Sequence, residues 1–266
     1  MRHIVVTDLD GTLLNRHTYR FTGALDAIEK LNQHQIPIIL NSSKTIAETQ
    51  DIREQLRNQE PFVCENGGMF CTVKNLVDEL DAEQELDIRF LGTLRKDFLD
   101  DLAAIKQELN LNYQGFSEST VEEVVAWTGL DPLSARKAMA RELTEPLLWK
   151  DDEKALDLLR SYLKELNLQC VQGEIFNFVA GYFNKASCFS DLRNYYSQLW
   201  QEDVEIVALG SSQPNLPMLE KADISIIIPN QEGDSLKPNC SYTFWSSHQA
   251  SEGWQEGINF CFKHVF

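Results

Sequence analysis

The chain has 266 residues, 43% of them hydrophobic, which is enough for one large domain or two of ordinary size with a sizeable core. Its formal net charge of -17 at pH 7 disfavours nucleic acid and anionic membranes as partners. No apolar run is long enough to span a bilayer, and the cysteines show no C-x-x-C spacing. These features predict a cytoplasmic protein with reduced thiols.

The first predicted element is a strand at residues 4–7, an apolar run rich in β-branched residues that is typical of a buried parallel strand. It leads into Asp8-Leu9-Asp10-Gly11-Thr12, with two carboxylates two residues apart. Open α/β sheets bind ligands at the carboxyl ends of their strands. Asp8 and Asp10 are therefore candidate catalytic residues, one to attack and one to move a proton, with a hard cation screening their repulsion. The alternative interpretation is an Asp-Gly turn.

The next elements alternate between helix and strand: a helix at 22–33, a strand at 37–40, a helix at 45–57 and a strand at 61–64. The first three elements of the chain predict a right-handed βαβ unit. The strand at 37–40 ends in Asn41-Ser42-Ser43-Lys44-Thr45, and the strand at 61–64 ends in Glu65-Asn66-Gly67-Gly68. Because Asn-Gly favours positive φ, the second of these segments also predicts a hairpin turn.

The pattern changes between residues 86 and 181. Helices are expected at 93–109, 119–127, 132–141 and 153–166, and strands at 111–115, 146–150 and 169–178. Helices inserted together with an antiparallel sheet indicate an α+β cap. The sequence thus predicts an α/β, doubly wound parallel-sheet core at residues 1–85 and 182–266, with an inserted α+β cap domain at residues 86–181.

The chain then returns to the core, with a helix at 186–200, strands at 204–209 and 224–229, and a last helix near 254–264. Lys185 is expected to open the first of these helices. The helix macrodipole mildly disfavours a cation in the first turn. We therefore favour a functional role for Lys185 over a solvated lysine.

The D-x-D-G-T string resembles the signature of the haloacid-dehalogenase superfamily. The resemblance implies that Asp8 is the phosphoryl-accepting nucleophile, Asp10 the general acid/base and Mg2+ the cofactor. Ser42 matches the second motif, whose hydroxyl bonds the phosphoryl group, and Lys185 matches the third, which offsets negative charge. The loops after the second and third predicted strands are then expected to line the substrate site, through Ser43, Lys44, Glu65, Asn66 and Gly67.

Further segments resemble one branch of that superfamily, the mannosyl-3-phosphoglycerate phosphatases with a type IIB cap. They are Ser42-Ser43-Lys44-Thr45, Glu65-Asn66-Gly67-Gly68, Trp127-Thr128-Gly129-Leu130, Glu145-Pro146-Leu147-Leu148-Trp149 and Glu252-Gly253-Trp254.

The fourth motif departs from the family pattern G-D-x-x-N-D. Here the strand at 204–209 is followed by Gly210-Ser211-Ser212-Gln213-Pro214-Asn215, so that Ser211 and Asn215 stand where the family has acids. The predicted metal ligands are therefore Asp8, Asp10, Ser211 and Asn215. Because Mg2+ prefers carboxylates, these replacements predict weaker metal binding. Glu65, Glu220 and Asp223 are alternative sources of a carboxylate.

A second departure lies in the cap, where the family strand reads roughly G-G-R-F-x-H. Ile175 and Phe178 replace its Arg and His, and Glu174 adds an acid. These changes remove cationic partners for a substrate carboxylate.

Together these features predict a Mg2+-dependent phosphomonoester hydrolase that acts on a phosphorylated sugar or glycerate derivative through an aspartyl-phosphate. The expected partner is a small phosphorylated substrate, and the expected assembly is a monomer or weak homodimer. The altered fourth motif and cap leave open the alternative of a catalytically impaired relative that binds a phosphorylated ligand or a protein partner.

Overall fold

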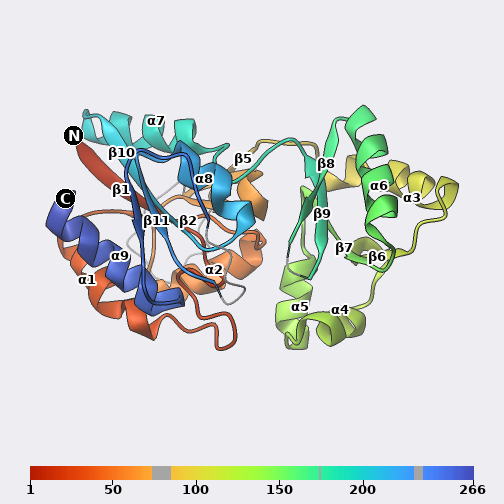
Figure 1. The fold of residues 1–266 in the computed structure, drawn as a ribbon, viewed down its shortest axis with the longest axis horizontal. Coiled ribbons are helices and arrows are strands. Elements are labelled where there is room, and N and C mark those ends of the chain that lie inside the picture. Colours follow the sequence, from red (N-terminus) through yellow and green to blue (C-terminus); the bar gives the residue numbers. More distant parts are fainter. Residues whose placement is uncertain (74–84, 174, 231–235) are drawn as a thin grey trace. The chain divides into compact units, whose positions relative to one another are not determined.

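The computed structural model describes residues 1–73, 85–173, 175–230 and 236–266 (Figure 1). The chain divides into two compact units. The first comprises Met1–Ser43, Leu56–Arg89 and Asn184–Phe266, and the second comprises Lys44–Gln55 and Phe90–Phe183. The grouping of residues 44–55 with the inserted unit was not predicted from the sequence.

A five-stranded parallel sheet is the centre of the first unit, in the order β12-β11-β10-β1-β2. Its strands are β1 (Arg2–Thr7), β2 (Ile38–Leu40), β10 (Val204–Gly210), β11 (Ile224–Ile227) and β12 (Thr243–Trp245). Ile4, Val5 and Val6 are consecutive in β1 and all fully buried. Both faces of this strand are therefore covered, which explains its continuous apolar run. The predicted parallel-sheet α/β core is confirmed.

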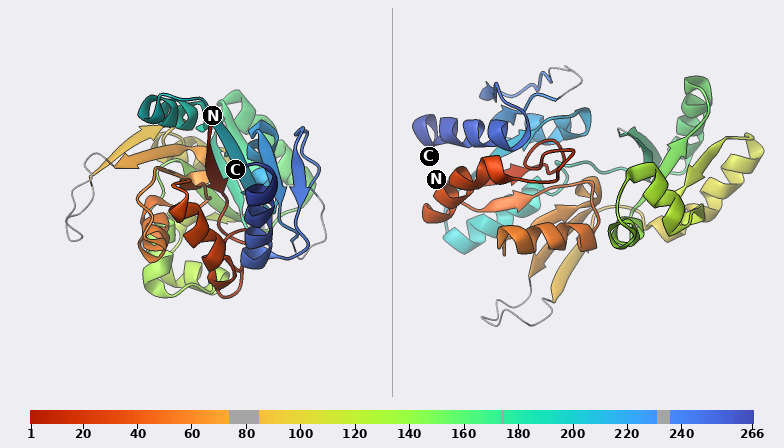
Figure 2. Two further views of the ribbon diagram at one scale, coloured as in Figure 1. Left: turned by 90° about the vertical axis from the view of Figure 1, so that its left-hand side faces the viewer. Right: turned by 90° about the horizontal axis from the view of Figure 1, so that it is seen from below.

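Helices cover both faces of this sheet (Figures 1 and 2). They are η1 (Thr22–Ala24), α1 (Leu25–Gln33), α7 (Phe189–Trp200), α8 (Leu216–Lys221) and α9 (Ala250–His264). Helices α1 and α9 pack together on one side, and α7 lies on the other. Helix α1 buries Ala27, Ile28 and Leu31, which recur with the period of an amphipathic helix.

A smaller sheet in the order β3-β4-β5 also belongs mainly to this unit. It contains β3 (Phe62–Cys64), β4 (Met69–Val73) and β5 (Leu86–Phe90). Strands β3 and β4 pair antiparallel with Cys64 opposite Met69, and the short helix η2 (Glu65–Gly67) forms the turn between them. The hairpin predicted from Asn66-Gly67 is confirmed, whereas β4, β5 and β12 were not predicted.

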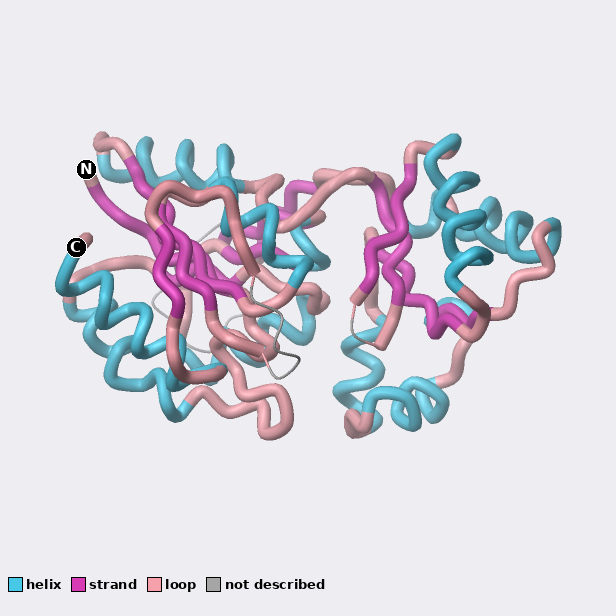
Figure 3. The backbone as a smooth tube through the Cα atoms, viewed as in Figure 1, coloured by secondary structure: helices cyan, strands magenta, loops and turns pink. Residues whose placement is uncertain are grey.

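The second unit contains a four-stranded antiparallel sheet, in the order β6-β7-β9-β8, together with helices (Figure 3). Its strands are β6 (Tyr113–Gly115), β7 (Thr144–Trp149), β8 (Leu168–Gln172) and β9 (Asn177–Gly181). Its helices include α2 (Ile46–Leu56, grouped here through Gln55), α3 (Leu99–Glu108), α4 (Val121–Thr128), α5 (Pro132–Met139) and α6 (Glu153–Glu165). Short 3-10 helices lie at Arg95–Asp97 and Phe116–Glu118.

Two apolar clusters stabilise the second unit. Leu147 of β7 packs with the buried leucines of α3 and α6, whereas the next residue, Leu148, packs with the cluster at α4 and α5. Because successive side chains of a strand point to opposite faces, the two clusters cover opposite faces of the sheet.

The strand predicted at residues 169–178 is wrong, because this stretch contains β8, a turn and β9. Gln172 pairs with Asn177, and the Gly173 N–H donates to the carbonyl oxygen of Phe176 at 2.9 Å. Gly173 has no room for a side chain, since an added Cβ would lie 2.8 Å from that oxygen. Gly173 was the sequence signal for this turn. Glu174, the added acid of the cap, lies outside the described residues.

Among the described helices, none is long and apolar enough to cross a membrane. The six cysteines all fall within the described ranges and are free thiols.

Candidate active site

Three neighbouring strands of the parallel sheet end at the same edge. Thr7 of β1 lies opposite Leu40 of β2 and Leu209 of β10. The next residues of the three strands are Asp8, Asn41 and Gly210, so the polar segments that follow these strands begin side by side. This register brings the first, second and fourth sequence motifs together, as expected for ligand sites of α/β sheets.

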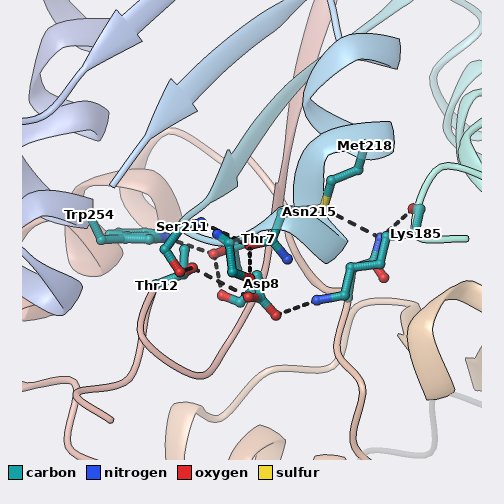
Figure 4. Close-up of polar contacts among 10 residues, drawn as sticks. Thr7, Asp8, Thr12, Lys185, Ser211, Asn215, Met218 and Trp254 are labelled. Atoms are coloured by element: carbon teal, nitrogen blue, oxygen red, sulfur yellow. Dashed lines mark hydrogen bonds and ion pairs between the residues drawn. The ribbon is translucent and has the colours of Figure 1, made fainter. Parts of the chain in front are cut away.

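Asp8 is a buried carboxylate with a cationic partner (Figure 4). The Lys185 Nζ donates to Asp8 Oδ1 at 2.5 Å, and both side chains are at most 8% exposed. The Thr12 hydroxyl lies 3.4 Å from Asp8 Oδ2, and the Asp8 N–H donates to the Leu209 carbonyl oxygen at 3.1 Å. These contacts fix the position of the Asp8 carboxylate beside the Lys185 ammonium.

Asp10 lies in a tight turn immediately after Asp8 and is half-buried. The Gly11 N–H donates to the Leu14 carbonyl oxygen at 2.9 Å, and the Leu14 N–H donates to the Leu9 carbonyl oxygen at 2.8 Å. Gly11 has a φ of +75°, a conformation that glycine adopts without steric cost. The turn places Asp10 in the same loop as Asp8.

Lys185 does not open a helix, so that prediction is wrong: it lies in a turn, and α7 begins only at Phe189. The helix-macrodipole argument therefore does not apply to it. The Asn41 side chain holds the turn in place, because its Nδ2 donates to the Lys185 carbonyl oxygen at 2.7 Å. Burial raises the pKa of the nearby Cys188 thiol to about 12, so this thiol stays protonated at neutral pH.

The loop Glu65–Gly67 lies beside Ser42 and the Lys185 turn. The Asn66 N–H donates to the Ser42 carbonyl oxygen at 2.9 Å, and Ser42 and Glu65 are fully buried. Gly67 packs so closely on the Lys185 turn that an added Cβ would lie 1.9 Å from the Asn184 carbonyl oxygen. The structure thus brings together Asp8, Lys185, Ser42 and this loop from four separate segments of the first unit.

The two remaining residues predicted to line the substrate site follow Ser42 directly. Ser43 ends a segment of the first unit, and Lys44 begins a segment of the second. The Lys44 Nζ lies 3.9 Å from Glu48 Oε1, an i,i+4 ion pair.

Gly67→Ala should lower the free energy of unfolding by about 2–5 kcal/mol, because Gly67 combines a φ of +98° with the close approach to Asn184. Gly129→Ala is the matched control, since Gly129 has a φ of +73° and no heavy atom within 4 Å of an added Cβ. It should lose only about 1 kcal/mol. Urea unfolding of both variants measures the difference; equal losses would show that the close approach at Gly67 carries no energy.

The fourth motif forms a neutral hydrogen-bonded cluster (Figure 4). Asn215 Oδ1 accepts from the Ser211 N–H at 2.8 Å, from the Ser212 N–H at 2.9 Å and from the Ser212 hydroxyl at 3.1 Å. Its Nδ2 is buried and finds no hydrogen-bond partner within the described ranges. The Thr12 hydroxyl donates to Ser211 Oγ at 2.9 Å, which connects this motif to the loop that carries Asp8.

The predicted metal ligands suit Mg2+ unequally. Mg2+ is often held by one or two carboxylates, with waters and substrate phosphate completing its shell; Asp8 can supply a carboxylate, and Asp10 its backbone carbonyl oxygen. Asn215 is a poorer ligand, because its only side-chain oxygen already accepts three hydrogen bonds. In the part of the chain that the structure describes, no cluster of three or more His, Cys, Asp or Glu residues could hold a metal ion. Asp8 and the Asp10 carbonyl oxygen therefore fit Mg2+, whereas Asn215 in its present hydrogen bonds does not.

Sequence reasoning missed Thr12 and Asn41, which orient the ion pair. Both stand inside motifs that were recognised, Thr12 after the Asp-x-Asp-Gly run and Asn41 before Ser42. It also missed that Thr7 and Trp254 contact each other near Asp8. The available signal was that Trp254 belongs to Glu252-Gly253-Trp254, one of the segments that resemble the phosphatase branch.

A family profile described as haloacid dehalogenase-like hydrolase matches residues 5–252 of the chain. The chain is 30% identical over 258 residues to a glucosyl-3-phosphoglycerate/mannosyl-3-phosphoglycerate phosphatase of Persephonella marina, covering 96% of this chain and 95% of that protein. It is 33% identical over 238 residues to a protein of the same name from Methanococcoides burtonii, covering 88% of this chain and 87% of that protein.

Solved structures of low sequence identity share the fold. A haloacid dehalogenase-like hydrolase from Bacteroides thetaiotaomicron superposes with a TM-score of 0.67 at 16% identity, covering 98% of this chain and all of that one. A sugar phosphatase of HAD subclass IIB gives a TM-score of 0.63 at 13% identity, covering 99% and 98%. With the family profile spanning nearly its whole length, this chain belongs to the haloacid dehalogenase-like hydrolases.

Proposed function

We propose that this protein is a phosphomonoester hydrolase that acts on a phosphorylated sugar or glycerate derivative. The observation that carries the proposal is the buried ion pair of Asp8 with Lys185, at the edge of the sheet where Asp10 follows in the next turn. A buried carboxylate held by one ammonium is oriented for attack on an electrophile. The two relatives named above are phosphatases of sugar-linked phosphoglycerates, which supports phosphorus as that electrophile.

In the proposed reaction, an Asp8 carboxylate oxygen attacks phosphorus in line, and the bond from phosphorus to the leaving oxygen breaks. Asp10 donates a proton to that leaving oxygen and then removes a proton from the water that hydrolyses the aspartyl-phosphate. Lys185 and the Ser42 hydroxyl hold the phosphoryl oxygens. Mg2+ would be held by the Asp8 carboxylate and the Asp10 backbone carbonyl oxygen, with Ser211 and Asn215 beside them, and would neutralise charge on Asp8 and the phosphoryl group.

The groups proposed to recognise the rest of the substrate are polar and belong to the loops after β2 and β3. They are Ser43, Lys44, Glu65, Asn66 and the backbone of Gly67. Lys44 is a cation suited to a glycerate carboxylate. In the inserted unit, Ile175 before β9 and Phe178 within β9 stand in place of basic residues, which favours a sugar phosphate with fewer anionic groups than the relatives' substrates.

The test is release of inorganic phosphate from p-nitrophenyl phosphate and from mannosyl-3-phosphoglycerate. We expect hydrolysis in millimolar Mg2+ and its loss on chelation with EDTA. An absence of phosphate release from both compounds, in a protein that melts cooperatively, would reject the proposal.

A second candidate function is binding of a phosphorylated ligand without turnover. The three hydrogen bonds that Asn215 Oδ1 accepts favour this candidate. They occupy the only side-chain oxygen of the residue that stands where the family has a metal-binding acid. Calorimetric binding of mannosyl-3-phosphoglycerate in a protein that releases no phosphate would support this candidate.

A further inference from the structure

The segment Glu252-Gly253-Trp254 lies near the start of helix α9, where Gly253 packs closely on the loop that precedes the helix. A Cβ added to Gly253 would lie 2.0 Å from the His248 carbonyl oxygen. One turn later, a Cβ added to Gly257 would lie 2.4 Å from Ile226 Cγ2 of β11. Gly257 therefore removes a side chain that would hold α9 away from the sheet, and Gly253 removes one that would collide with the loop before the helix. The close approach carries Trp254 into the core.

Trp254 reaches the end of the strand that carries the nucleophile (Figure 4). Its side chain is fully buried, and its indole Nε1–H donates to Thr7 Oγ1 at 3.0 Å. The Thr7 hydroxyl in turn donates to the Asp8 carbonyl oxygen at 2.8 Å. A continuous chain of hydrogen bonds thus connects the last helix to the peptide group that follows Asp8.

The direction of each hydrogen bond in this chain follows from donor and acceptor chemistry. An indole nitrogen only donates, so the Thr7 oxygen has to accept from it. The single hydroxyl proton of Thr7 then remains available for the Asp8 carbonyl. Without the indole, this hydroxyl would lose the buried donor that orients it, and rotation away from Asp8 would become easier.

We propose that Trp254 is a positioning residue that acts through Thr7 to set the orientation of Asp8. The inference rests on the proposed function, because it assigns Asp8 as the nucleophile. Strand pairing holds the Asp8 N–H on Leu209, and the Thr7 hydroxyl holds its carbonyl group. With both ends of the residue held, the carboxylate points to the same place in each catalytic cycle. A displacement of about 1 Å at a reacting group lowers rates by up to about a hundredfold.

Three variants test the proposal kinetically. Trp254→Phe removes the N–H and keeps an aromatic ring, Thr7→Val removes the hydroxyl at nearly constant volume, and the third variant combines both changes. Each should lower kcat for p-nitrophenyl phosphate about tenfold and leave KM within about twofold. Because the residues act in one chain, the double variant should lose no more than the larger single loss.

Trp245→Phe is the matched control, since Trp245 is 53% exposed and its indole N–H, like that of Trp254, has an oxygen acceptor, here the Leu236 carbonyl oxygen at 3.4 Å. It should leave kcat unchanged. An unchanged kcat in Trp254→Phe, losses that multiply in the double variant, or a rise in KM at constant kcat would each overturn the proposal. If Trp254→Phe fails to fold, Thr7→Val decides, because it leaves the tryptophan in place.

A measurement independent of turnover separates this inference from the proposed function. The Asp8 carbonyl shares its peptide group with the Leu9 N–H, so the Leu9 amide resonance reports the orientation of that peptide. It should shift in Trp254→Phe and Thr7→Val and stay in place in Trp245→Phe. No phosphate release from the parent protein would reject the proposed function. An unmoved Leu9 resonance would reject the positioning role, whether or not the parent is active.

Discussion

Asp8→Asn should lower kcat by more than about a thousandfold, because a carboxamide cannot form the acyl-phosphate that the proposed reaction requires. The side chain keeps its size and one acceptor oxygen for Lys185. It loses the charge that offsets this buried ammonium, so the free energy of unfolding should also fall, by roughly 3 kcal/mol. Phosphate release and thermal melting, measured on the same preparation, separate lost chemistry from lost stability.

Two further variants make the Asp8 result specific. Asp26→Asn removes an exposed carboxylate in the first turn of α1, which is not among the residues assigned to the site, and should leave kcat unchanged. Asp10→Asn should also lower kcat severely, because the leaving oxygen loses its proton donor. Activity at the parent level in folded Asp8→Asn would show that another site, or a contaminating enzyme, releases the phosphate.

Changing Ser211→Asp and Asn215→Asp together should tighten Mg2+ binding by about 10–100-fold. At position 215 the change is chemically conservative: one carboxylate oxygen can keep the three hydrogen bonds that Asn215 Oδ1 accepts. The second oxygen replaces the amide nitrogen that is buried without a partner in the described parts of the chain. At position 211 a carboxylate can still accept from Thr12. Phosphatase activity should rise with metal affinity.

Calorimetric titration of Mg2+ into parent and double variant measures this effect. Gln107→Glu combined with Gln198→Glu is the control, since it adds the same two charges at exposed positions and should leave the affinity unchanged. The restored acids should also destabilise the metal-free protein, because they add to the repulsion between Asp8 and Asp10. Equal affinity in parent and double variant would mean that the fourth motif is aligned incorrectly, or that another carboxylate already serves as a ligand.

The predicted elements were wrong where the residue pattern continues through a point at which the chain turns. The stretch 169–178 has the apolar content of one long strand, but Gly173 allows the chain to reverse between β8 and β9. The residues after Lys185 are suited to a helix, but the helix begins only at Phe189, and Lys185 lies in the turn before it. Strands β5 and β12 contain no buried residue, so their side-chain patterns carry little signal.

The sequence alone determined four strands of the parallel sheet (all but β12), the Asp8–Asp10 pair at the end of its first strand and the departure at Ser211 and Asn215. These features depend on residue type and spacing within a few positions, which local patterns report well. The sequence also indicated the family, because segments that match different family motifs are spread along the whole chain.

Only the tertiary structure decided which side chains contact one another. Lys185 is 177 residues from Asp8, and Trp254 is 247 residues from Thr7. Their contacts depend on strand register, on the Asn41 bond to the Lys185 turn and on the close approach of α9. Such hydrogen bonds form only when distant segments are packed to within a fraction of an ångström, and no local periodicity encodes that distance.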